Sequence, residues 1–432
     1  MSSPVRILLL NQVFYPDVAA TAQHGHDLAK HLVAHGHEVV AIASRSIYGQ
    51  KGATLSKRET IDGIEIHRVG ASLFGKAGIF ARIADFALFY LLATIKSMTI
   101  KRPDVVICFT TPPFIALAGA LLKALRGCRL VYWIMDLYPD VLVASGSLKP
   151  RSIFTRILEH ISRLCMRSAD RIVVLGRCMR HVVLEKGLAD AEKVVHLGVW
   201  SDDDEVKPVA REANPYRAEW KLGERFVVMY SGNFGLVHDV ETMCEAARLL
   251  RDDKRIAFAF VGGGKRKAEV LAFVRTHALD ARIEPYQPRD KLDALLSCAD
   301  VHLVTLQPGF EGLVVPSKMY GIMAAGRPAL VVGPATSEVA LVAGESGCGR
   351  VIDPGDSAGL AKAIRDLAHD PEAARAMGER GRADLHARHS RERLCEGWRR
   401  LLEGLVDAPS SVGLTAVPKI EITDATASAD LQ

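Results

Sequence analysis

The stretch Phe226-Val-Val-Met-Tyr-Ser-Gly-Asn-Phe-Gly-Leu-Val-His-Asp239 contains a complete passage from strand to helix. Its first residues, up to Tyr230, form a short apolar run rich in β-branched and aromatic side chains, which predicts a buried strand. Ser231 to Gly235 predict a tight loop, and a helix is expected to begin near Asp239, because aspartate is a good N-cap residue. Strands that pass directly into helices are the units of parallel sheets.

The same alternation recurs along the whole chain. In the first half we expect strands near Arg6–Leu10, Glu38–Ala43, Asp104–Phe109, Leu130–Trp133 and Arg171–Leu175. In the second half we expect them near Phe226–Tyr230, Ile256–Val261, Val301–Thr305, Ala329–Val332 and Gly349–Ile352. A chain of 432 residues exceeds the usual size of one core, and a polar stretch between residues 200 and 222 suits a boundary. The sequence therefore predicts an α/β fold with two Rossmann-like domains that face a cleft.

The charge is divided unevenly between the two halves. Residues 1–201 hold 25 Lys+Arg against 15 Asp+Glu, a net charge of +10, whereas the remainder holds 30 against 35, a net of −5. A basic first half predicts an anionic ligand or surface. The eight cysteines form no CxxC pair and no cluster with histidine, which argues against a disulfide scaffold or a zinc site. The amino terminus runs directly into a strand without a signal peptide, so we expect a cytoplasmic protein.

Two segments of the basic half combine apolar and basic residues, namely residues 73–102 and 151–167. The uncharged run Phe86–Ile95 is about half of the ~20 residues needed to cross a bilayer, so it suits a helix that lies on a membrane. The alternative is that both segments are core helices with solvated basic faces. Nucleic-acid binding is disfavoured, because the basic residues alternate with aliphatic ones and not with stacking platforms. From residue 407 onward the composition predicts a flexible tail.

Three strand-end turns of the second half suit a phosphate. Ser231, Gly232 and Asn233 offer amides and a hydroxyl before a helix, and Gly262-Gly-Gly264 lets a ligand approach the backbone beside the cations 265–267, of which Lys265 comes first. The third turn is residues 310–328. There Ser317 is expected to cap a short helix, and Lys318 in its first turn would be balanced by an external anion. Ordinary glycine turns with solvated lysines are the alternative.

Further candidates follow other predicted strands. Tyr286 and Pro288 belong to a rigid loop that suits a nucleobase, although Tyr286 can equally pack locally. Asp136 follows the fourth strand and should point into the cleft, unless it caps the next segment or pairs with a basic neighbour. Asp140 is expected to be structural. In the loop after the first strand, Asp17 is a candidate for a ligand hydroxyl, with a simple turn as the alternative.

Taken together, these motifs resemble the GT-B glycosyltransferases of family 4, especially the bacterial branch that builds lipid-linked surface polysaccharides. The matching pieces are Tyr15-Pro16 with Gly36-His-Glu-Val39, Asp136-Leu-Tyr-Pro139, Ser168–Leu175, Tyr230-Ser-Gly-Asn233, Val261-Gly-Gly-Gly264 and Pro316-Ser-Lys-Met-Tyr-Gly321 through Ala324–Pro328. The resemblance covers about residues 6 to 405. It implies an acceptor domain at 1–205 that faces a membrane, a nucleotide-sugar domain at 206–388, and a helix at 389–406 that crosses back to the first domain, followed by the tail 407–432.

The resemblance also implies roles for individual residues. The donor phosphates would lie near Ser231, Gly232, Asn233, Gly263 and Lys265, the base near Tyr286 and Pro288, and the ribose and sugar near residues 311–321, with Glu311, Gly312, Leu313 and Ser317 as candidates. Tyr15, Asp17 and Thr21 would contact the acceptor. Two departures stand out: the two positions where the family usually has glutamates are Leu313 and Gly321, and Ala19-Ala-Thr21 replaces the usual glycine pair.

The implied activity is transfer of a sugar, with retention, from a nucleotide diphosphate to a polyprenyl-pyrophosphate-linked acceptor at the inner face of the cell membrane. The sugar stays open, with an N-acetylated amino sugar or a deoxy sugar among the candidates. No metal or cofactor is expected, and Asp136, Lys265 and Lys318 are the catalytic candidates. The alternatives are a nucleotide-sugar 2-epimerase on the same architecture and an inactive scaffold at the membrane.

Overall fold

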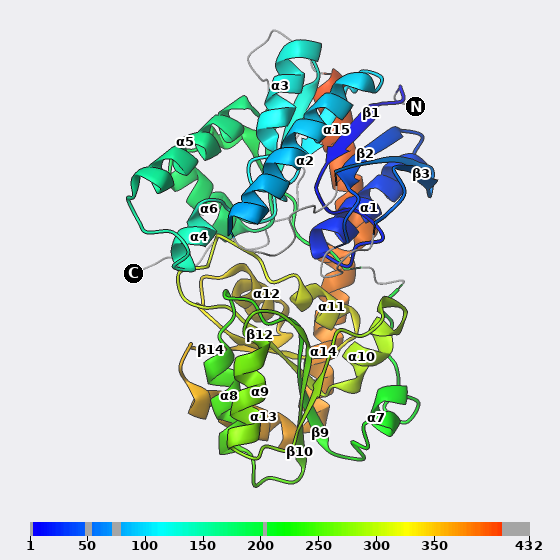
Figure 1. The fold of residues 1–432 in the computed structure, drawn as a ribbon. Coiled ribbons are helices and arrows are strands. Elements are labelled where there is room, and N and C mark those ends of the chain that lie inside the picture. The colour runs from blue at the N-terminus through cyan, green and yellow to red at the C-terminus, as the bar shows by residue number, and fades with distance from the viewer. Residues whose placement is uncertain (1–2, 48–53, 71–78, 202–204, 408–432) are drawn as a thin grey trace, which may run out of the picture.

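The computed structural model describes residues 3–47, 54–70, 79–201 and 205–407, with the side chains of 79–83 left undescribed. Within these residues the chain forms two sheets (Figure 1). The strands of the first are β1 Arg6–Leu10, β2 Glu38–Ser44, β3 Arg58–Ile61, β4 Ile64–Val69, β5 Val105–Cys108, β6 Arg129–Ile134, β7 Arg171–Val174 and β8 Val194–His196. Those of the second are β9 Phe226–Asn233, β10 Ile256–Gly263, β11 Ala281–Glu284, β12 Val301–Thr305, β13 Ala329–Val332 and β14 Gly349–Ile352. The predicted pair of parallel-sheet α/β units is confirmed.

The first sheet has the order β3-β4-β2-β1-β5-β6-β7-β8 and is parallel except for the pair β3–β4. The sequence prediction missed β3, β4 and β8. The antiparallel hairpin turns at Asp62 and Gly63, whose φ angles of 51° and 77° are both positive. An Asp-Gly turn of this kind is a recognised hairpin signal, so β3 and β4 were detectable from the sequence.

Helices cover both sheets. Those of the first half are α1 Ala20–Ala34, α2 Ile79–Thr99, α3 Ala116–Arg126, α4 Asp140–Ala144, α5 Ile153–Ser168, α6 Arg177–Glu185 and the 3₁₀ turn η1 Ala191–Lys193. Those that follow are α7 Pro215–Glu219, α8 Val240–Leu249, α9 Lys267–Thr276, η2 Arg289–Lys291, α10 Leu292–Cys298, α11 Lys318–Ala324, α12 Glu338–Ser346, α13 Ser357–His369, α14 Pro371–Asp384, the π-helical turn η3 Leu385–His389 and α15 Arg391–Asp407. None of the described helices is long and apolar enough to cross a membrane.

The second sheet has the order β11-β10-β9-β12-β13-β14 and is parallel throughout. Its strands β9 and β10 are longer than predicted, since they pair through Gly232 opposite Gly262 and Asn233 opposite Gly263. Glycine makes this extension possible, because Gly232 and Gly262 have φ angles of 135° and 133°, which other residues rarely adopt. The glycine motifs are therefore strand ends and not free loops.

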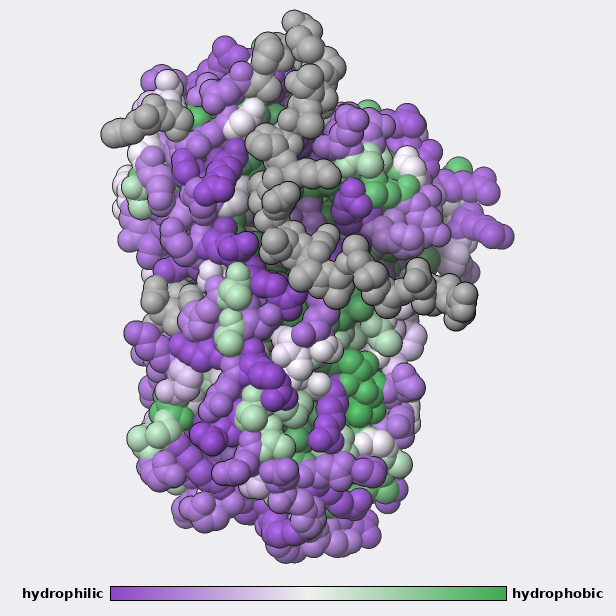
Figure 2. All heavy atoms as spheres, turned by 180° about the vertical axis from the view of Figure 1, so that it is seen from behind, coloured by the Kyte–Doolittle hydropathy of each residue, from purple (hydrophilic) through white to green (hydrophobic). Residues whose placement is uncertain are grey.

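The last helix returns to the first half, as expected (Figure 1). α15 packs along α1, and its Trp398 ring lies 4.4 Å from the ring of Trp133 on β6. Trp200, which follows β8, adds its ring 5.8 Å from that of Trp133. Burial of three large aromatic rings anchors α15 to the first half. Seen from behind, both halves have a mostly hydrophilic surface with separate apolar areas (Figure 2). The expected tail lies outside the described residues, except for Asp407.

Candidate functional site

The two glycine motifs of the second half pack directly against each other at the carboxyl ends of β9 and β10. A Cβ added at Gly262 would collide with the carbonyl oxygen of Gly232, and one added at Gly264 would collide with Asn233 and with the Phe234 backbone. Ser231 and Gly232 are partly exposed, and Asn233 is exposed. The predicted donor residues of these two motifs therefore form one surface at the carboxyl ends of β9 and β10, which we call the glycine surface.

Tyr286 lies on this surface. Its ring occupies the space beside Gly263, 2.9 Å from where a Cβ would lie, and its hydroxyl is 3.5 Å from the Gly263 carbonyl oxygen. The residue is 57% exposed. Pro288 is exposed two residues later and directly precedes the short turn η2.

The three cations after the glycines differ in their surroundings. Arg266 is buried and pairs with Glu241 and Glu269, and the ammonium group of Lys267 donates to the carbonyl oxygens of Gly262 (2.6 Å) and Glu284 (2.8 Å). These two residues hold the loop together. Lys265 is exposed and remains a candidate for a phosphate.

Lys318 lies beneath the glycine surface. Its Nζ is shielded from solvent, has no hydrogen-bond partner among the described residues, and lies 3.5 Å from the centre of the Tyr230 ring. A Cβ at Gly232 would be 3.4 Å from this Nζ. Burial lowers the pKa of Lys318 well below its usual value. The pKa of the neighbouring His238 is lowered to about 3, mainly by burial and next by the charge of Lys318. Its imidazole is therefore neutral.

A buried ammonium group without a hydrogen-bonded partner is costly, and it marks a place for a negative charge. The Tyr230 ring supplies only partial compensation through its π face. The sequence pattern did not indicate this ring, because Tyr230 and Lys318 belong to distant parts of the chain. Lys318 therefore stays a candidate for contact with an anionic ligand.

The start of α11 differs from the prediction in one respect. Ser317 precedes the helix but makes no side-chain capping hydrogen bond, because its φ and ψ of −61° and −20° are already helical. A capping residue needs an extended backbone for its side chain to reach the free amides. The predicted Ser317 cap was therefore wrong, and the amides at this helix start have no cap from that side chain.

The segment before α11 contacts the first half. The amide of Leu137 donates to the carbonyl oxygen of Leu313 (2.9 Å), and an antiparallel bridge pairs Asp136 with Val314. Gly312, with a φ of 75°, lies so close to Val182 on α6 that a Cβ would be 2.6 Å from its methyl carbon. The backbones of Gly312 and Leu313 thus join the two halves.

The carboxylate of Glu311 accepts a hydrogen bond from the Gly309 amide (2.7 Å), which forms a local turn. Of the two positions where the related family usually has glutamates, Leu313 is buried at the junction, and Gly321 lies against Leu296.

Asp136 lies at this junction, directly after β6. Its amide donates to the hydroxyl of Thr110 (3.2 Å), and burial raises the pKa of its carboxyl group to about 6. A carboxyl group with such a pKa can accept or hold a proton near neutral pH. Asp140 instead begins α4 and forms an ion pair with Lys186, in agreement with its expected structural role.

The loop after β1 is the third part of the predicted site. Tyr15 is exposed and stacks on His26 with ring centres 4.3 Å apart. The Asp17 carboxylate accepts a hydrogen bond from the Ala19 amide (3.0 Å). Asp17 thus makes the turn that the sequence allowed as an alternative. Thr21 lies in the first turn of α1, which begins at Ala20.

The sequence analysis missed an ion pair that also joins the halves. Arg177, the first residue of α6, donates its amide (2.6 Å) and its Nε (3.1 Å) to the carboxylate of Glu338 on α12. The Nη1 atom of Arg177 also donates a hydrogen bond to the carboxylate of Glu345 (2.5 Å). Glu338 is buried, so the arginine is what satisfies its charge.

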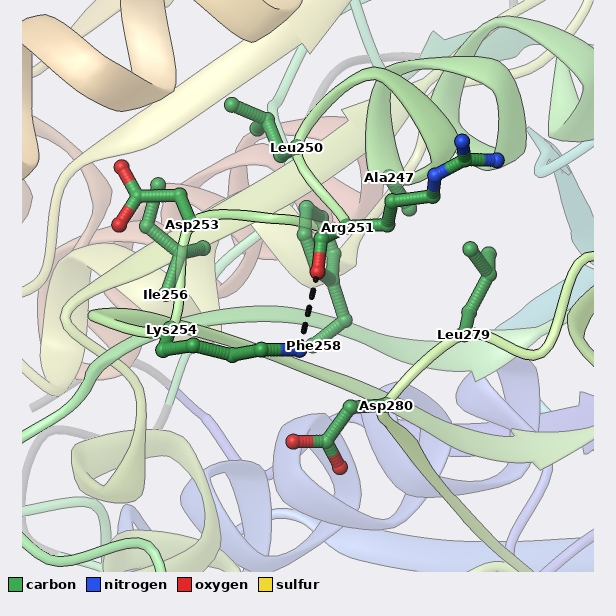
Figure 3. Close-up of a pocket in the computed structure, with 9 residues that line it drawn as sticks. All are labelled: Ala247, Leu250, Arg251, Asp253, Lys254, Ile256, Phe258, Leu279 and Asp280. Atoms are coloured by element: carbon green, nitrogen blue, oxygen red, sulfur yellow. Dashed lines mark hydrogen bonds between the residues drawn. The ribbon is translucent and has the colours of Figure 1, made fainter.

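A small hollow elsewhere in the second half is unrelated to these groups (Figure 3). It is lined by Ala247, Leu250, Arg251, Asp253, Lys254, Ile256, Phe258, Leu279 and Asp280. Ile256 begins β10, whereas the glycines end it, so the hollow lies at the opposite edge of the sheet. The carboxyl edge is where open α/β sheets bind ligands.

Comparison with known proteins agrees with this geometry. Residues 20–200 match the model of the glycosyl transferase 4-like domain, and residues 213–384 match that of glycosyl transferases group 1. The probable glycosyltransferase WbjE of Pseudomonas aeruginosa is 36% identical over 274 residues, which cover 62% of this chain and 66% of that protein, just under two thirds of its length. The putative colanic acid biosynthesis glycosyl transferase WcaI of Escherichia coli K12 is 28% identical over 349 residues, covering 78% of this chain and 85% of that protein.

A solved structure shows the same fold. HepE of Anabaena, crystallised with UDP-glucose, superposes with a TM-score of 0.70 at 13% identity, over 93% of this chain and 100% of that one. The two family models together span most of the chain and meet where the two sheets separate. The chain therefore belongs to the glycosyltransferases of family 4 with the GT-B fold.

Proposed function

We propose that this glycosyltransferase moves a sugar from a nucleotide diphosphate to a polyprenyl-pyrophosphate-linked acceptor in the synthesis of a surface polysaccharide. The observation that carries the proposal is the buried Nζ of Lys318, which has no hydrogen-bonded partner among the described residues and lies next to Gly232. A diphosphate on the glycine surface would supply the missing negative charge. The UDP-glucose bound by HepE, a protein of the same fold, supports a nucleotide sugar as the donor.

The acceptor and the place of reaction are part of the same proposal. The relative WcaI is named for colanic acid biosynthesis, which supports a polysaccharide as the product. A growing chain carried on a polyprenyl lipid lies in a membrane, and the net charge of +10 on residues 1–201 favours an anionic surface there. We place the enzyme at the inner face of the cell membrane, with the loop of Tyr15, Asp17 and Thr21 on the acceptor side.

The proposed reaction proceeds with retention and without a metal ion. The bond from the anomeric carbon to the donor phosphate oxygen breaks, and a bond to the acceptor oxygen forms on the same face. The acceptor hydroxyl proton passes to the departing phosphate oxygen. Negative charge develops on the diphosphate, so Lys318 and the exposed Lys265 would stabilise the transition state electrostatically. Asp136, at the junction of the halves, would orient the sugar or the acceptor.

The test is a screen of nucleotide sugars with a membrane extract that contains polyprenyl-linked acceptors. Transfer should occur in the presence of EDTA, and NMR of the product should show the anomeric configuration of the donor. Loss of transfer in EDTA that Mg²⁺ restores, or an inverted product, would refute the metal-independent retaining reaction.

Incubation with the donor alone separates the alternatives. A 2-epimerase would release the isomerised nucleotide sugar without an acceptor, whereas the transferase should leave the sugar unchanged. An inactive scaffold would neither bind nucleoside diphosphates saturably nor transfer a sugar. Saturable binding together with transfer would exclude both alternatives.

A further inference from the structure

Exposed apolar side chains gather on three neighbouring helices of the first half. Of the thirteen large apolar residues that are exposed among those described, eight lie on α2, α3 and α5. They are Leu91 and Ile95 on α2, Leu121 and Leu125 on α3, and Ile153, Phe154, Ile157 and Leu164 on α5. The exposed fractions reach 75% at Ile153 and 65% at Leu125. Exposed apolar residues that gather on neighbouring helices of a soluble domain mark an interaction site.

The three helices form one layer. α2 packs against α3, and α3 packs against α5, so that their outer faces adjoin on one side of the first sheet (Figure 1). On each helix the exposed residues include a pair four positions apart, namely 91 and 95, 121 and 125, and 153 and 157. Residues at this spacing share one helix face. The outward faces of three packed helices are thus apolar where solvent-facing residues are normally polar.

Basic residues accompany the apolar ones on α5. Between residues 149 and 168 the chain has Lys149, Arg151, Arg156, Arg163 and Arg167 against a single acid, Glu159. All four arginines are exposed, and none of them has an ion-pair partner in the described parts of the chain. Unpaired cations beside exposed aliphatic side chains fit the interface of an anionic bilayer, where the apolar groups enter the lipid and the cations meet the headgroups.

We infer that the outer face of α2, α3 and α5 docks on an anionic phospholipid bilayer and fixes how the enzyme sits on the membrane. The inference rests on the proposed function in one respect, since a lipid-linked acceptor requires the enzyme to reach a bilayer. A second copy of the chain is a poorer occupant, because a twofold contact through the same face would bring the arginines of both copies together.

The apolar part is tested with the triple variant Ile153→Ser, Phe154→Ser and Ile157→Ser. Serine and isoleucine have similar helix propensities, and exposed side chains leave no cavity, so α5 should remain folded. Flotation with vesicles of phosphatidylcholine and phosphatidylglycerol should show binding of the wild type that weakens with salt. The triple variant should bind on the order of a hundredfold less.

The electrostatic part is tested with Arg156→Gln and Arg163→Gln. Each should weaken binding about fivefold on anionic vesicles and have little effect on pure phosphatidylcholine, since each cation near an anionic surface contributes about that factor. The matched controls are Leu249→Ser on α8 and Arg375→Gln on α14, which are also exposed but lie in the second half. They should bind as the wild type does.

Three results would overturn the inference. The first is absence of wild-type binding to anionic vesicles, and the second is unchanged binding of the triple variant. The third is a dimer of the wild type in light scattering that is lost in the triple variant, which would assign this face to a second copy of the chain. Thermal unfolding of each variant checks folding. Nucleoside-diphosphate binding, measured without vesicles, separates this inference from the proposed function: a chain that binds vesicles through α5 but neither binds nor uses a donor would refute the function alone.

Discussion

Replacement of Lys318, whose ammonium group is buried, by methionine should stabilise the free protein and weaken donor binding at the same time. An unsatisfied buried donor costs about 1–3 kcal/mol, and the Tyr230 ring at 3.5 Å offsets about 0.5–2 kcal/mol of that cost. Lys318→Met keeps an unbranched side chain in the same space but removes the charge. We expect a net gain of about 1 kcal/mol in the free energy of unfolding, or about 2–4 °C in thermal unfolding.

The gain from Lys318→Met should depend on pH. Because burial lowers the pKa of Lys318 well below its usual value of 10.5, the unfolded chain binds this proton more tightly than the folded chain. Wild-type stability should therefore rise with pH between the lowered pKa and about 10.5, and the full penalty should apply below the lowered pKa. The advantage of the methionine variant should be largest at low pH and shrink toward pH 10.5.

The assay is thermal unfolding at several pH values, with and without a panel of nucleoside diphosphates. Wild-type protein should be stabilised by its nucleotide, whereas Lys318→Met should bind about a hundredfold more weakly, as expected when a charged contact to an anion is lost. Lys318→Arg keeps the charge and serves as the control. A methionine variant that is less stable than the wild type at low pH, or that binds nucleotide equally well, would refute the assignment of Lys318 to an anion.

Other parts of the site allow further predictions. Burial raises the pKa of Asp136 to about 6, so kcat/KM should decrease below about pH 6, and Asp136→Asn should remove this decrease. Because the folded state holds this proton more tightly than the unfolded state, the free energy of unfolding of the wild type should also fall as pH rises from about 4 to 6. If the pH profiles of kcat/KM and of stability were unchanged in the variant, both effects would be contradicted. Gly262→Ala places a Cβ against the neighbouring strand at a φ of 133° and should lower the free energy of unfolding, measured with denaturant, by about 3 kcal/mol or more. The control Gly223→Ala also has a positive φ but no atom near the new Cβ, so it should lower this free energy by about 1–2 kcal/mol. Equal losses would argue against the close packing at Gly262. Arg177→Met should lower the free energy of unfolding by about 1–3 kcal/mol, less than for a fully buried ion pair because the arginine is partly exposed. Adding Glu338→Gln should recover part of this loss, because it removes the buried charge that has lost its partner. If the double variant were less stable than the single one, the ion pair would not be the cause.

Much of the fold follows from short-range patterns. Short apolar runs that alternate with helical segments predicted the central strands of both sheets, because burial on both faces acts within a few residues. The edge hairpin β3–β4 was missed although its turn at Asp62 and Gly63 carries a local signal. The strand ends at Gly232 and Gly262 extended beyond the prediction because their pairing depends on a second strand.

The sequence placed the candidate residues at strand ends, since the order of strands and helices brings the carboxyl ends of a parallel sheet to one edge. Only the tertiary structure decided which of them meet. Lys318 reaches Tyr230 and Gly232, and Asp136 pairs with Val314, through contacts between segments far apart in the chain. The Lys318 contacts depend on how α11 packs against the end of β9, and the Asp136 bridge depends on how the two halves meet. No local pattern encodes either arrangement. Likewise, the burial that lowers the pKa of Lys318, the residue that we propose to contact the donor diphosphate, exists only in the folded protein.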